Sequence, residues 1–481
     1  MCVYQPLIFF VINGYIIEIS NHIGELEFGE IKLAVIMTTV AREEPYAAVL
    51  ETPILPTLCS GCFKINTDLS PCNKCKTVYY CSHKCRASDA AEHQTECAAL
   101  IRVKPHLPSS AVRLMARIFW KLDRERVGEC APTGAAFNGR TFDNLMEHAD
   151  EIRKDEEACG DAYHLSSIVT QYVGNDVMRN SVGLITVFGK VRTNSFSILG
   201  EDLSEVGAGL YLGLAVHDHS CTPDAFVLFD GKKALLRVPK TGAVYSPDLR
   251  ICYVDMMQKT SDRRKKLEKP YYFTCTCALC TDSQRDALAL STKCERCQTG
   301  ACPLDERKDQ LVCKDCGQPQ KLTVEEALRL NQQLHFMISH KDSTPLASMD
   351  LGHELATMAP TYDKFAKILS PLNMDLAVYG NRLLTAAYLS GRTDILEKYA
   401  FVTVRAYKEY LPLGHPELSA RLLLAAEAAS CADYLTQDIV NIIDDAFGAY
   451  VVSHGRDHPS TQMAEHMLVN VKTRLQNQED C

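Results

Sequence analysis

The stretch that decides the fold of this chain reads CSGCFKINTDLSPCNKCKTVYYCSHKCRASDAAEHQTEC and covers residues 59–97. Seven cysteines and His93 stand there at the close spacing of metal ligands. Zinc takes four soft ligands in a tetrahedron, and close pairs of thiolates supply two of them from one turn. Eight ligands therefore predict two zinc sites. Their interleaved order favours a cross-brace, with Cys59, Cys62, Cys81 and Cys85 on one ion and Cys72, Cys75, His93 and Cys97 on the other.

The cysteine content of the whole chain favours zinc over disulfides. The 481 residues include 22 cysteines, and fifteen of these fall in closely spaced groups. This pattern is typical of metal binding in a reducing compartment, not of a secreted disulfide scaffold. A disulfide cluster or a chance grouping is the alternative for residues 59–97, and the regular spacing argues against both. No targeting signal stands out, so we expect the protein in the cytoplasm and the nucleus.

The composition is that of a globular protein with two or three domains. Apolar residues make up 46% and charged residues 23% of the chain. The net charge of -9 gives no overall basic field, so DNA is not an expected partner. Residues 7–17 are strongly apolar, but they are too short to span a membrane and lack a basic flank. We therefore expect neither a membrane anchor nor a signal peptide. The Asn13-Gly14 pair favours a tight hairpin instead.

Secondary-structure patterns change along the chain. Residues 1–58 and 186–255 have the character of short strands and loops, and Gly207-Ala208-Gly209 is expected to form a break between strands. Residues 98–185 look helical, since 112–122 carries apolar residues at helical spacing. From about residue 322 the chain is expected to be helical to its end.

A faint repeat lies inside this helical tail. Gly414-His415-Pro416 and Asp457-His458-Pro459 each precede an expected helix and stand 43 residues apart. A repeat of this period predicts a TPR-like array of helix pairs, with an irregular helical bundle as the alternative.

Two further cysteine groups lie between the strands and the helical tail. The first is Cys275-x-Cys277-x2-Cys280. The second has the spacing of a zinc ribbon and consists of Cys294, Cys297, Cys313 and Cys316, with Cys302 spare. A cysteine-rich loop without metal is the alternative for the second group.

Five short motifs occur in a fixed order after the first zinc-binding stretch. They are Asn194-Ser195-Phe196, Gly209-Leu210-Tyr211, Asp218-His219-Ser220-Cys221-x-Pro223, Ile251-Cys252-Tyr253-x-Asp255, and Tyr271-Tyr272-Phe273-Thr274-Cys275. Together with residues 59–97, which resemble a MYND zinc finger, they resemble the SET and MYND domain-containing (SMYD) protein-lysine methyltransferase family.

The resemblance implies an α+β fold, a β-rich SET core split by an inserted MYND zinc finger and followed by a helical, TPR-like C-terminal domain. The expected segments are a divergent N-terminal part of SET at 1–58, the MYND finger at 59–97, a helical SET insert at 98–185, the SET core at 186–255, a post-SET zinc segment at 256–285, a possible zinc ribbon at 286–321, and the helical domain at 322–481.

The resemblance also implies the chemistry and its residues. A lysine amine would attack the sulfonium methyl of S-adenosyl-L-methionine, and the protein would mainly position the two and exclude water. Tyr253 resembles the tyrosine whose phenol lies at the channel for the target lysine in this family. The alternative is that Tyr253 is a buried core tyrosine. The residues that match cofactor contacts of the family are Asn194, Asp218, His219, Tyr253, Phe273 and His148.

The same family comparison assigns Cys221 as the fourth ligand of a third zinc, beside Cys275, Cys277 and Cys280. A free, packed Cys221 is the alternative. We thus expect three zinc ions, with a fourth at residues 294–316 left open.

Some positions depart from the family pattern. No Gly-x-Gly opens the first strand, so residues 1–36 are expected to be a divergent or wrongly assigned start, with Met37 beginning the familiar part. Asp218 replaces an asparagine, and Tyr245-Ser246-Pro247-Asp248 stands where relatives have Gly-Glu-Glu.

We therefore carry two functions forward. The first is a lysine methyltransferase that acts as a monomer on histone or non-histone protein. The second is a catalytically degenerate adaptor that binds partner peptides through the finger and the helical tail.

Overall fold

The computed structural model describes residues 37–128, 136–179, 183–200, 203–240, 242–341, 350–430 and 435–479, and two short strands before them. These strands, β1 (Phe9–Ile12) and β2 (Tyr15–Glu18), pair antiparallel on either side of Asn13-Gly14. The pairing agrees with the hairpin expected there, although the two turn residues themselves lie outside the described residues. Residues 19–36, which belong to the stretch expected to form short strands and loops, also lie outside them.

Two three-stranded antiparallel sheets form the β core. One has the strand order β3 (Thr38–Glu43), β10 (Lys233–Val238), β9 (Phe226–Asp230), and the other β4 (Ala47–Leu50), β8 (Glu205–Leu210), β7 (Ser195–Leu199). Gly207 lies inside β8 and not in a loop, so the break between strands that was expected at 207–209 is wrong. A Cβ at Gly207 would lie 2.3 Å from the Val49 carbonyl oxygen, so the close approach of β4 requires glycine.

Residues 59–97 fold as the finger, with the two-residue strands β5 (Ser70–Pro71) and β6 (Tyr79–Tyr80) and the short helix α1 (His83–Ser88). The Ser82 side chain accepts from the Cys85 amide and so caps α1. This cap places Cys81 and Cys85 on adjacent turns. His93 and Cys97 lie one turn apart on the next helix, α2 (Ala90–Val103).

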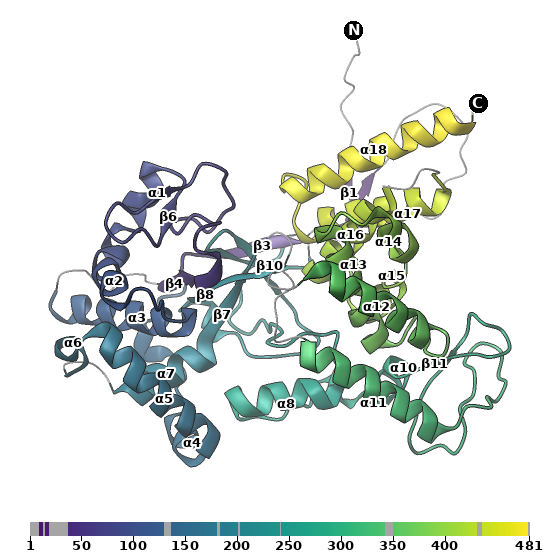
Figure 1. Cartoon of the computed structure of the whole chain (residues 1–481), viewed down its shortest axis with the longest axis horizontal. Helices are drawn as coiled ribbons and strands as arrows, with labels where there is room; N and C mark the ends of the chain where they lie inside the picture. Colours follow the sequence, from purple (N-terminus) through teal and green to yellow (C-terminus); the bar gives the residue numbers. More distant parts are fainter. Residues whose placement is uncertain are drawn as a thin grey trace, which may run out of the picture.

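Helices pack around the β core on the finger's side (Figure 1). Besides α2 they are α3 (Ser110–Arg126), α4 (Ala149–Lys154), α5 (Glu156–Val173), α6 (Asn175–Arg179) and α7 (Leu184–Asn194). Short 3-10 turns occur at Thr52–Ile54, Phe142–Asn144 and Leu214–Val216.

Helix α7 overturns part of the expectation for residues 186–255. Its sequence is rich in β-branched residues, which favour strands, yet it is helical to Asn194. Val187 and Phe188 are buried, and a Cβ at Gly189 would lie 1.9 Å from the Glu147 carbonyl oxygen. Close packing against the segment before α4 therefore overrides the local preference, and the chain changes from helix to strand at residue 194.

Helix α3 carries three cationic residues on a buried stretch that runs through ten consecutive positions. Arg113 and Arg117 bind the buried carboxylate of Glu96 on α2, with Nε–Oε1 at 2.7 Å and Nη2–Oε2 at 2.6 Å. Arg117 also binds Asp89 at 3.0 Å. The guanidinium groups reach the β4 carbonyls of Leu50 and Ala48. The finger helix, α3 and the β core are thus joined by one buried ionic network.

A connecting segment follows the β core. It contains α8 (Thr260–Tyr271), α9 (Ala278–Thr281), α10 (Ser283–Ala289), and the paired strands β11 (Thr292–Lys293) and β12 (Ala301–Cys302). The sequence analysis did not anticipate α8. Its mean hydropathy is low because nine of its twelve residues are charged, serine or threonine, and only Thr260, Arg263 and Leu267 are buried.

The C-terminal domain is helical throughout its described residues, as expected. Its helices are α11 (Val324–Lys341), α12 (Leu351–Ala366), α13 (Met374–Leu389), α14 (Thr393–Tyr399), α15 (Val404–Tyr410), α16 (Pro416–Ser430), α17 (Gln437–Ser453) and α18 (Pro459–Glu479). Among the described residues, no helix combines the length and apolar character needed to cross a membrane.

The two His-Pro motifs adopt the same local structure. In each, the histidine Nδ1 accepts from the amide two residues later, at 3.2 Å, and the proline opens the next helix. Proline suits the first helical position because no amide is lost there. The repeat predicted from the sequence therefore marks equivalent starts of α16 and α18.

The C-terminal domain contacts the far end of the β core (Figure 1). Arg237 on β10 donates to the carbonyls of Met37 and His454, and the Met37 amide donates to Val452 at 3.3 Å. Met37, Val452, Phe226 and Leu228 form a small apolar cluster at this contact. The sheet and the helical domain are thus connected at one edge.

Candidate active site and zinc centres

The finger residues converge in two groups with the combination that the spacing predicts. Cys59, Cys62, Cys81 and Cys85 form one, and Cys72, Cys75, His93 and Cys97 the other, with all ligand atoms of a group within 4.8 Å of one another. A tetrahedron with Zn–S bonds of about 2.3 Å has edges of about 3.8 Å. The Cys62–Cys81 and Cys72–Cys97 sulfur distances are 3.9 and 3.8 Å. The donor set and geometry fit zinc.

Cys221 joins Cys275, Cys277 and Cys280 in a third group. The Cys221–Cys280 sulfur distance is 3.5 Å. The buried guanidinium of Arg263 lies 3.5 Å from the Cys280 sulfur. Four thiolates around Zn²⁺ carry a net charge of about -2, which is costly to bury unpaired. Arg263, on the unanticipated helix α8, supplies compensating charge.

Cys294, Cys297, Cys313 and Cys316 form the fourth group. The Cys294–Cys316 and Cys297–Cys313 sulfur distances are 3.7 and 3.8 Å. The four thiols that the zinc-ribbon spacing singled out therefore lie at the corners of a similar tetrahedron.

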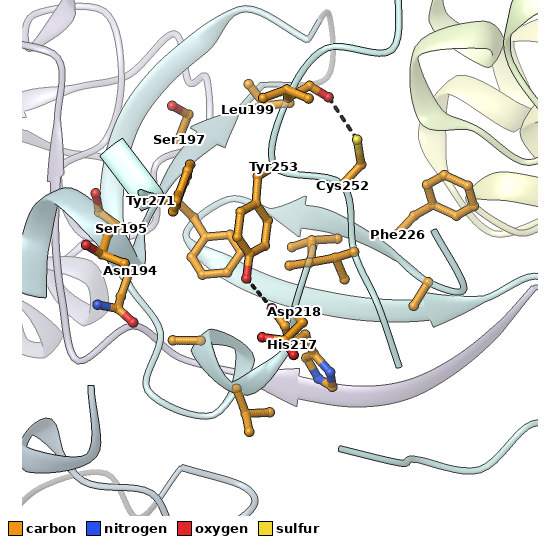
Figure 2. Close-up of a pocket in the computed structure, with 18 of the residues that line it drawn as sticks. Asn194, Ser195, Ser197, Leu199, His217, Asp218, Phe226, Cys252, Tyr253 and Tyr271 are labelled. Carbon is orange, nitrogen blue, oxygen red and sulfur yellow. Dashed lines mark hydrogen bonds between the residues drawn. The ribbon is translucent and has the colours of Figure 1, made fainter. Parts of the chain in front are cut away.

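A cavity of about 1020 Å³ lies between the β core and the C-terminal domain. Five of the six residues expected at the cofactor line it, although they come from distant parts of the chain: His148, Asn194, Asp218, Tyr253 and Phe273. Figure 2 shows Tyr253 near the middle, with Asn194 to one side, Tyr271 alongside and Asp218 close to the phenol.

Tyr253 is held as a neutral phenol. Its hydroxyl donates to the His217 carbonyl at 2.5 Å (Figure 2). Burial raises the pKa of Tyr253, and the negative charge of Asp218 raises it further. The ring lies 4.8 Å from that of Tyr271, between centroids. The phenol oxygen is therefore an acceptor fixed in place by its own donated bond, and not a base.

Asn194 connects the end of α7 with the start of α4. Its side-chain nitrogen donates to the carbonyls of Met146 at 2.7 Å and Lys190 at 2.8 Å. Met146 lies two residues before His148, which precedes α4 in a left-handed conformation (φ 48°). The structure thus brings His148 and Asn194 to the same wall of the cavity.

His219 does not line the cavity, unlike the other five. Its Nδ1 accepts from the Tyr253 amide at 3.0 Å, and its Nε2 lies 3.2 Å from the Cys221 sulfur. Burial, with the charges of Arg263 and Arg250, lowers the pKa of His219 to about 4. The neutral ring therefore joins Tyr253 to the third cysteine group.

Comparisons with known proteins find relatives that cover most of this chain. Residues 59–97 match the family model described as the MYND finger. The human histone-lysine N-methyltransferase SMYD3 is 29% identical over 423 residues, which cover 87% of this chain and 88% of that protein. Human histone-lysine N-methyltransferase SMYD1 is 25% identical over 452 residues, covering 90% and 84%. Chicken (Gallus gallus) N-lysine methyltransferase SMYD2 is 29% identical over 245 residues, covering 50% and 54%.

The chain is similar to SET and MYND methyltransferases over most of its length.

One position that departs from the family pattern, Tyr245, is well anchored. Tyr245 packs against Phe137, with ring centroids 4.8 Å apart, and its hydroxyl accepts from Asn138 at 3.1 Å. Nearby, the buried Glu43 carboxylate accepts from the amides of Gly213 and Leu214 at 2.7 and 2.9 Å. Burial raises the pKa of Glu43, and these amides oppose the rise. The turn that precedes Asp218 is therefore fixed from β3.

One wall of the cavity was missed by the sequence analysis. His415, Glu417 and Arg421, at the start of α16, line the cavity opposite the β core. Burial and the nearby charge of Asp255 raise the pKa of Glu417 to about 7, while Arg421, 3.4 Å away, opposes the rise. The His-Pro motif marked the start of α16, but nothing local indicated that this helix would face Tyr253.

Proposed function

We propose that this chain is an S-adenosyl-L-methionine-dependent protein-lysine N-methyltransferase that acts in the cavity around Tyr253. The observation that carries the proposal is the convergence of His148, Asn194, Asp218, Tyr253 and Phe273 on one cavity. Amide, imidazole and carboxylate groups suit the polar parts of the cofactor. The aromatic rings of Tyr253, Tyr271 and Phe273 suit a sulfonium cation, which is attracted to ring faces. The residues present therefore fit the cofactor.

When bound, the cofactor supplies a methyl group on a positively charged sulfur. The protein's part is to hold the target lysine and that methyl group in line and to exclude water. Because Tyr253 donates its proton to the His217 carbonyl, its oxygen faces reacting groups as an acceptor. It can accept weak C–H···O contacts from the methyl group and orient the incoming amine.

The lysine must arrive as the neutral amine. Tyr253 does not serve as its base, because burial and Asp218 keep the pKa of the phenol above its usual value. A narrow aromatic channel instead favours the uncharged amine by desolvation. Tyr253 and Tyr271 stand 4.8 Å apart between ring centroids and supply such walls.

The substrate is proposed to be a protein. Two of the relatives are named histone-lysine and another N-lysine methyltransferase. The cavity continues from Tyr253 to Glu417 and Arg421 of the C-terminal domain. A peptide that places a lysine at Tyr253 would therefore contact both lobes.

Calorimetric binding of S-adenosylhomocysteine to the zinc-loaded protein tests the proposal. We expect a dissociation constant of roughly 1 μM, or about -8 kcal/mol. Tyr253→Phe is the control for a subsequent lysine-substrate screen, because it keeps the ring and removes only the hydroxyl. Absence of binding would refute an enzyme that uses this cofactor.

The second candidate is a non-catalytic adaptor. It is favoured by Asp218, which places a carboxylate where the family pattern has an amide and so removes a donor from the cavity wall. In this case the finger and the helical domain would bind partner peptides, and the cavity would have no need of the cofactor. Binding of S-adenosylhomocysteine discriminates the two candidates.

A further inference from the structure

The segment between α10 and α11 contains one backbone turn twice. In the first turn, the Cys297 amide donates to the Cys294 sulfur at 3.5 Å. In the second, the Cys316 amide donates to the Cys313 sulfur at the same distance. In both, the amide that follows the second cysteine donates to the carbonyl of the first, at 3.1 and 3.0 Å. Each turn therefore directs an amide at the sulfur of its own first cysteine.

A left-handed residue closes each of these turns. It is Gln298 in the first (φ 60°) and Gly317 in the second (φ 67°). This conformation is costly for a residue with a side chain, because the Cβ crowds the backbone. Of the six described residues other than glycine that adopt it, three directly follow a Cys-x2-Cys pair. The strain is therefore tied to the turn and not scattered over the chain.

The other two of these three residues lie in the MYND finger. Phe63 and Lys76 follow its Cys-x2-Cys pairs with φ of 64° and 54°. Their amides donate to the carbonyls of Cys59 and Cys72 at 2.7 and 3.0 Å. Both pairs belong to the stretch that matches the MYND finger model. The segment before α11 thus has the backbone with which the finger presents its zinc ligands.

The two turns bring four sulfurs around a space for one ion. The Cys294–Cys316 and Cys297–Cys313 distances of 3.7 and 3.8 Å are those of a tetrahedron with one metal at its centre. Four thiolates in this geometry are typical of zinc or iron. The distances therefore favour a single ion held by both turns.

Neighbouring groups are arranged for thiolates and not for thiols. The buried side chain of Gln320 donates to the Cys294 sulfur at 3.6 Å, and its oxygen accepts from the Glu295 amide at 2.8 Å. A Cβ at Gly300 would lie 2.5 Å from the Cys313 sulfur. Donors directed at a sulfur suit the thiolate, which is the form of cysteine that binds a metal.

Little else holds this segment in shape. Its strands β11 and β12 have two residues each. The buried part of its apolar cluster consists of Cys294, Cys302, Leu304, Leu311, Cys313 and Ala327. Units with so small a core depend on a metal or a similar crosslink for their fold.

The same segment binds the C-terminal domain. The Lys293 amide donates to the Ile368 carbonyl at 2.7 Å, and the Ser370 amide donates to the Ser291 carbonyl at 3.1 Å. The buried side chain of Asn373, at the start of α13, donates to the same Ser291 carbonyl at 3.3 Å. The first cysteine of the first turn directly follows Lys293, so a metal bound there would fix the strand that makes these contacts.

We propose that this segment holds a fourth zinc ion and that the ion fixes the shape in which residues 291–293 bind the C-terminal domain. The ligands are the sulfurs of Cys294, Cys297, Cys313 and Cys316. The proposal does not depend on methyl transfer, because none of these residues lines the cavity around Tyr253.

Plasma mass spectrometry of the full chain, dialysed to remove loosely bound metal, tests the ion. Wild type should hold four equivalents of zinc and no iron. The double variant Cys313→Ser, Cys316→Ser should hold three. Cys159→Ser changes a thiol of α5 that lies outside all four cysteine groups. It is the matched control and should hold four equivalents.

Hydrogen exchange of wild type and the double variant tests the role of the ion. The amides of Lys293 and Ser370 should exchange at least about tenfold faster in the variant, because the metal-dependent shape is lost. The Met37 amide donates to Val452 at the other contact between the β core and the C-terminal domain. It is the internal control and should change far less.

Several results would overturn the proposal. Three equivalents in wild type, or iron in place of zinc, would exclude the fourth zinc site, and four equivalents in the double variant would assign the ion to other ligands. If the double variant does not fold, cadmium-113 NMR of cadmium-loaded wild type decides. It should show three ions with four sulfur ligands and one with three sulfurs and a nitrogen, and only two four-sulfur signals would refute the site. Unchanged exchange at Lys293 and Ser370 in a variant that holds three equivalents would refute the role in binding the C-terminal domain.

Discussion

Replacing Glu96 by glutamine tests the buried network that joins the finger to the β core. The carboxylate binds Arg113 and Arg117 and is fully buried. These two arginines outweigh the cost of burial and lower the pKa of Glu96 from 4.5 to about 2. At about 1.4 kcal/mol for each tenfold change in proton affinity, the drop corresponds to about 3 kcal/mol of stability.

The sign follows from the direction of the change. Because the pKa of Glu96 is lower in the folded state, the contribution is present above about pH 4.5 and is lost as the pH falls toward 2. At neutral pH, Glu96→Gln removes the charge and leaves two arginines buried with less compensation. We expect a loss of about 3 kcal/mol in the free energy of unfolding, near the lower end for breaking a buried ion pair.

The chain offers a local reporter for this measurement. Trp120 is the single tryptophan, lies on α3 one turn beyond Arg117, and is buried with its Nε1 donating to Val173 at 3.3 Å. Its fluorescence during a urea titration, with zinc present, follows unfolding of this lobe. With a urea dependence of about 3 kcal/mol per molar, the midpoint should fall by about 1 M.

Glu92→Gln is the matched control. Glu92 lies one turn earlier on α2 and binds Arg124 at 2.7 Å, but both side chains are partly exposed. Solvent-accessible pairs contribute about 1 kcal/mol or less. Equal midpoints for the two variants would refute the reasoning, since the buried pair would then contribute no more than the exposed one.

Four further predictions concern the cavity and the zinc centres. Tyr253→Phe should bind S-adenosylhomocysteine as wild type does but lose methyl transfer by about 10²-fold, the effect of one positioned polar group; equal rates would exclude its role. Asp218→Asn should weaken the binding of S-adenosylmethionine several-fold relative to that of S-adenosylhomocysteine, whose sulfur is uncharged, because about 1 kcal/mol of charge attraction is lost. Calorimetry with both ligands measures this; an unchanged ratio of the two dissociation constants would show that the carboxylate does not face the sulfonium. Arg263→Met should release the third zinc to a chelator faster than Arg263→Lys, because only the lysine retains the charge beside Cys280; identical release would assign the stability to the thiolates alone. Gly300→Ala should reduce the zinc content by one equivalent, because the added Cβ would meet the Cys313 sulfur at 2.5 Å, and an unchanged zinc count would contradict the geometry.

The zinc groups could be predicted from the sequence because their information is local. Cysteines two or three residues apart lie on one turn, so the spacing alone indicated which pairs act together. The helical domain was predictable for the same reason, since apolar periodicity and the His415-Pro416 and His458-Pro459 motifs are short-range signals.

The remaining features depend on contacts between distant residues. Arg113 and Arg117 are charged residues in a helix whose apolar pattern gave no reason to bury them, and only Glu96 explains their position. Gly189 and its β-branched neighbours favoured a strand, but the approach of Glu147 holds them in α7. His219 was expected at the cofactor through its backbone, and nothing local indicated that its ring would lie between the Tyr253 amide and the Cys221 sulfur.

The cavity is bounded by two parts of the chain that fold around separate cores. Tyr253 and its neighbours belong to the β core, whereas Glu417 and Arg421 belong to α16. This separation has an evolutionary consequence. In the proposed enzyme, substitutions on α16 would alter which peptide enters without disturbing the packing that holds Tyr253. A single chemical step can thus be redirected to new targets by drift in a domain that takes no part in it.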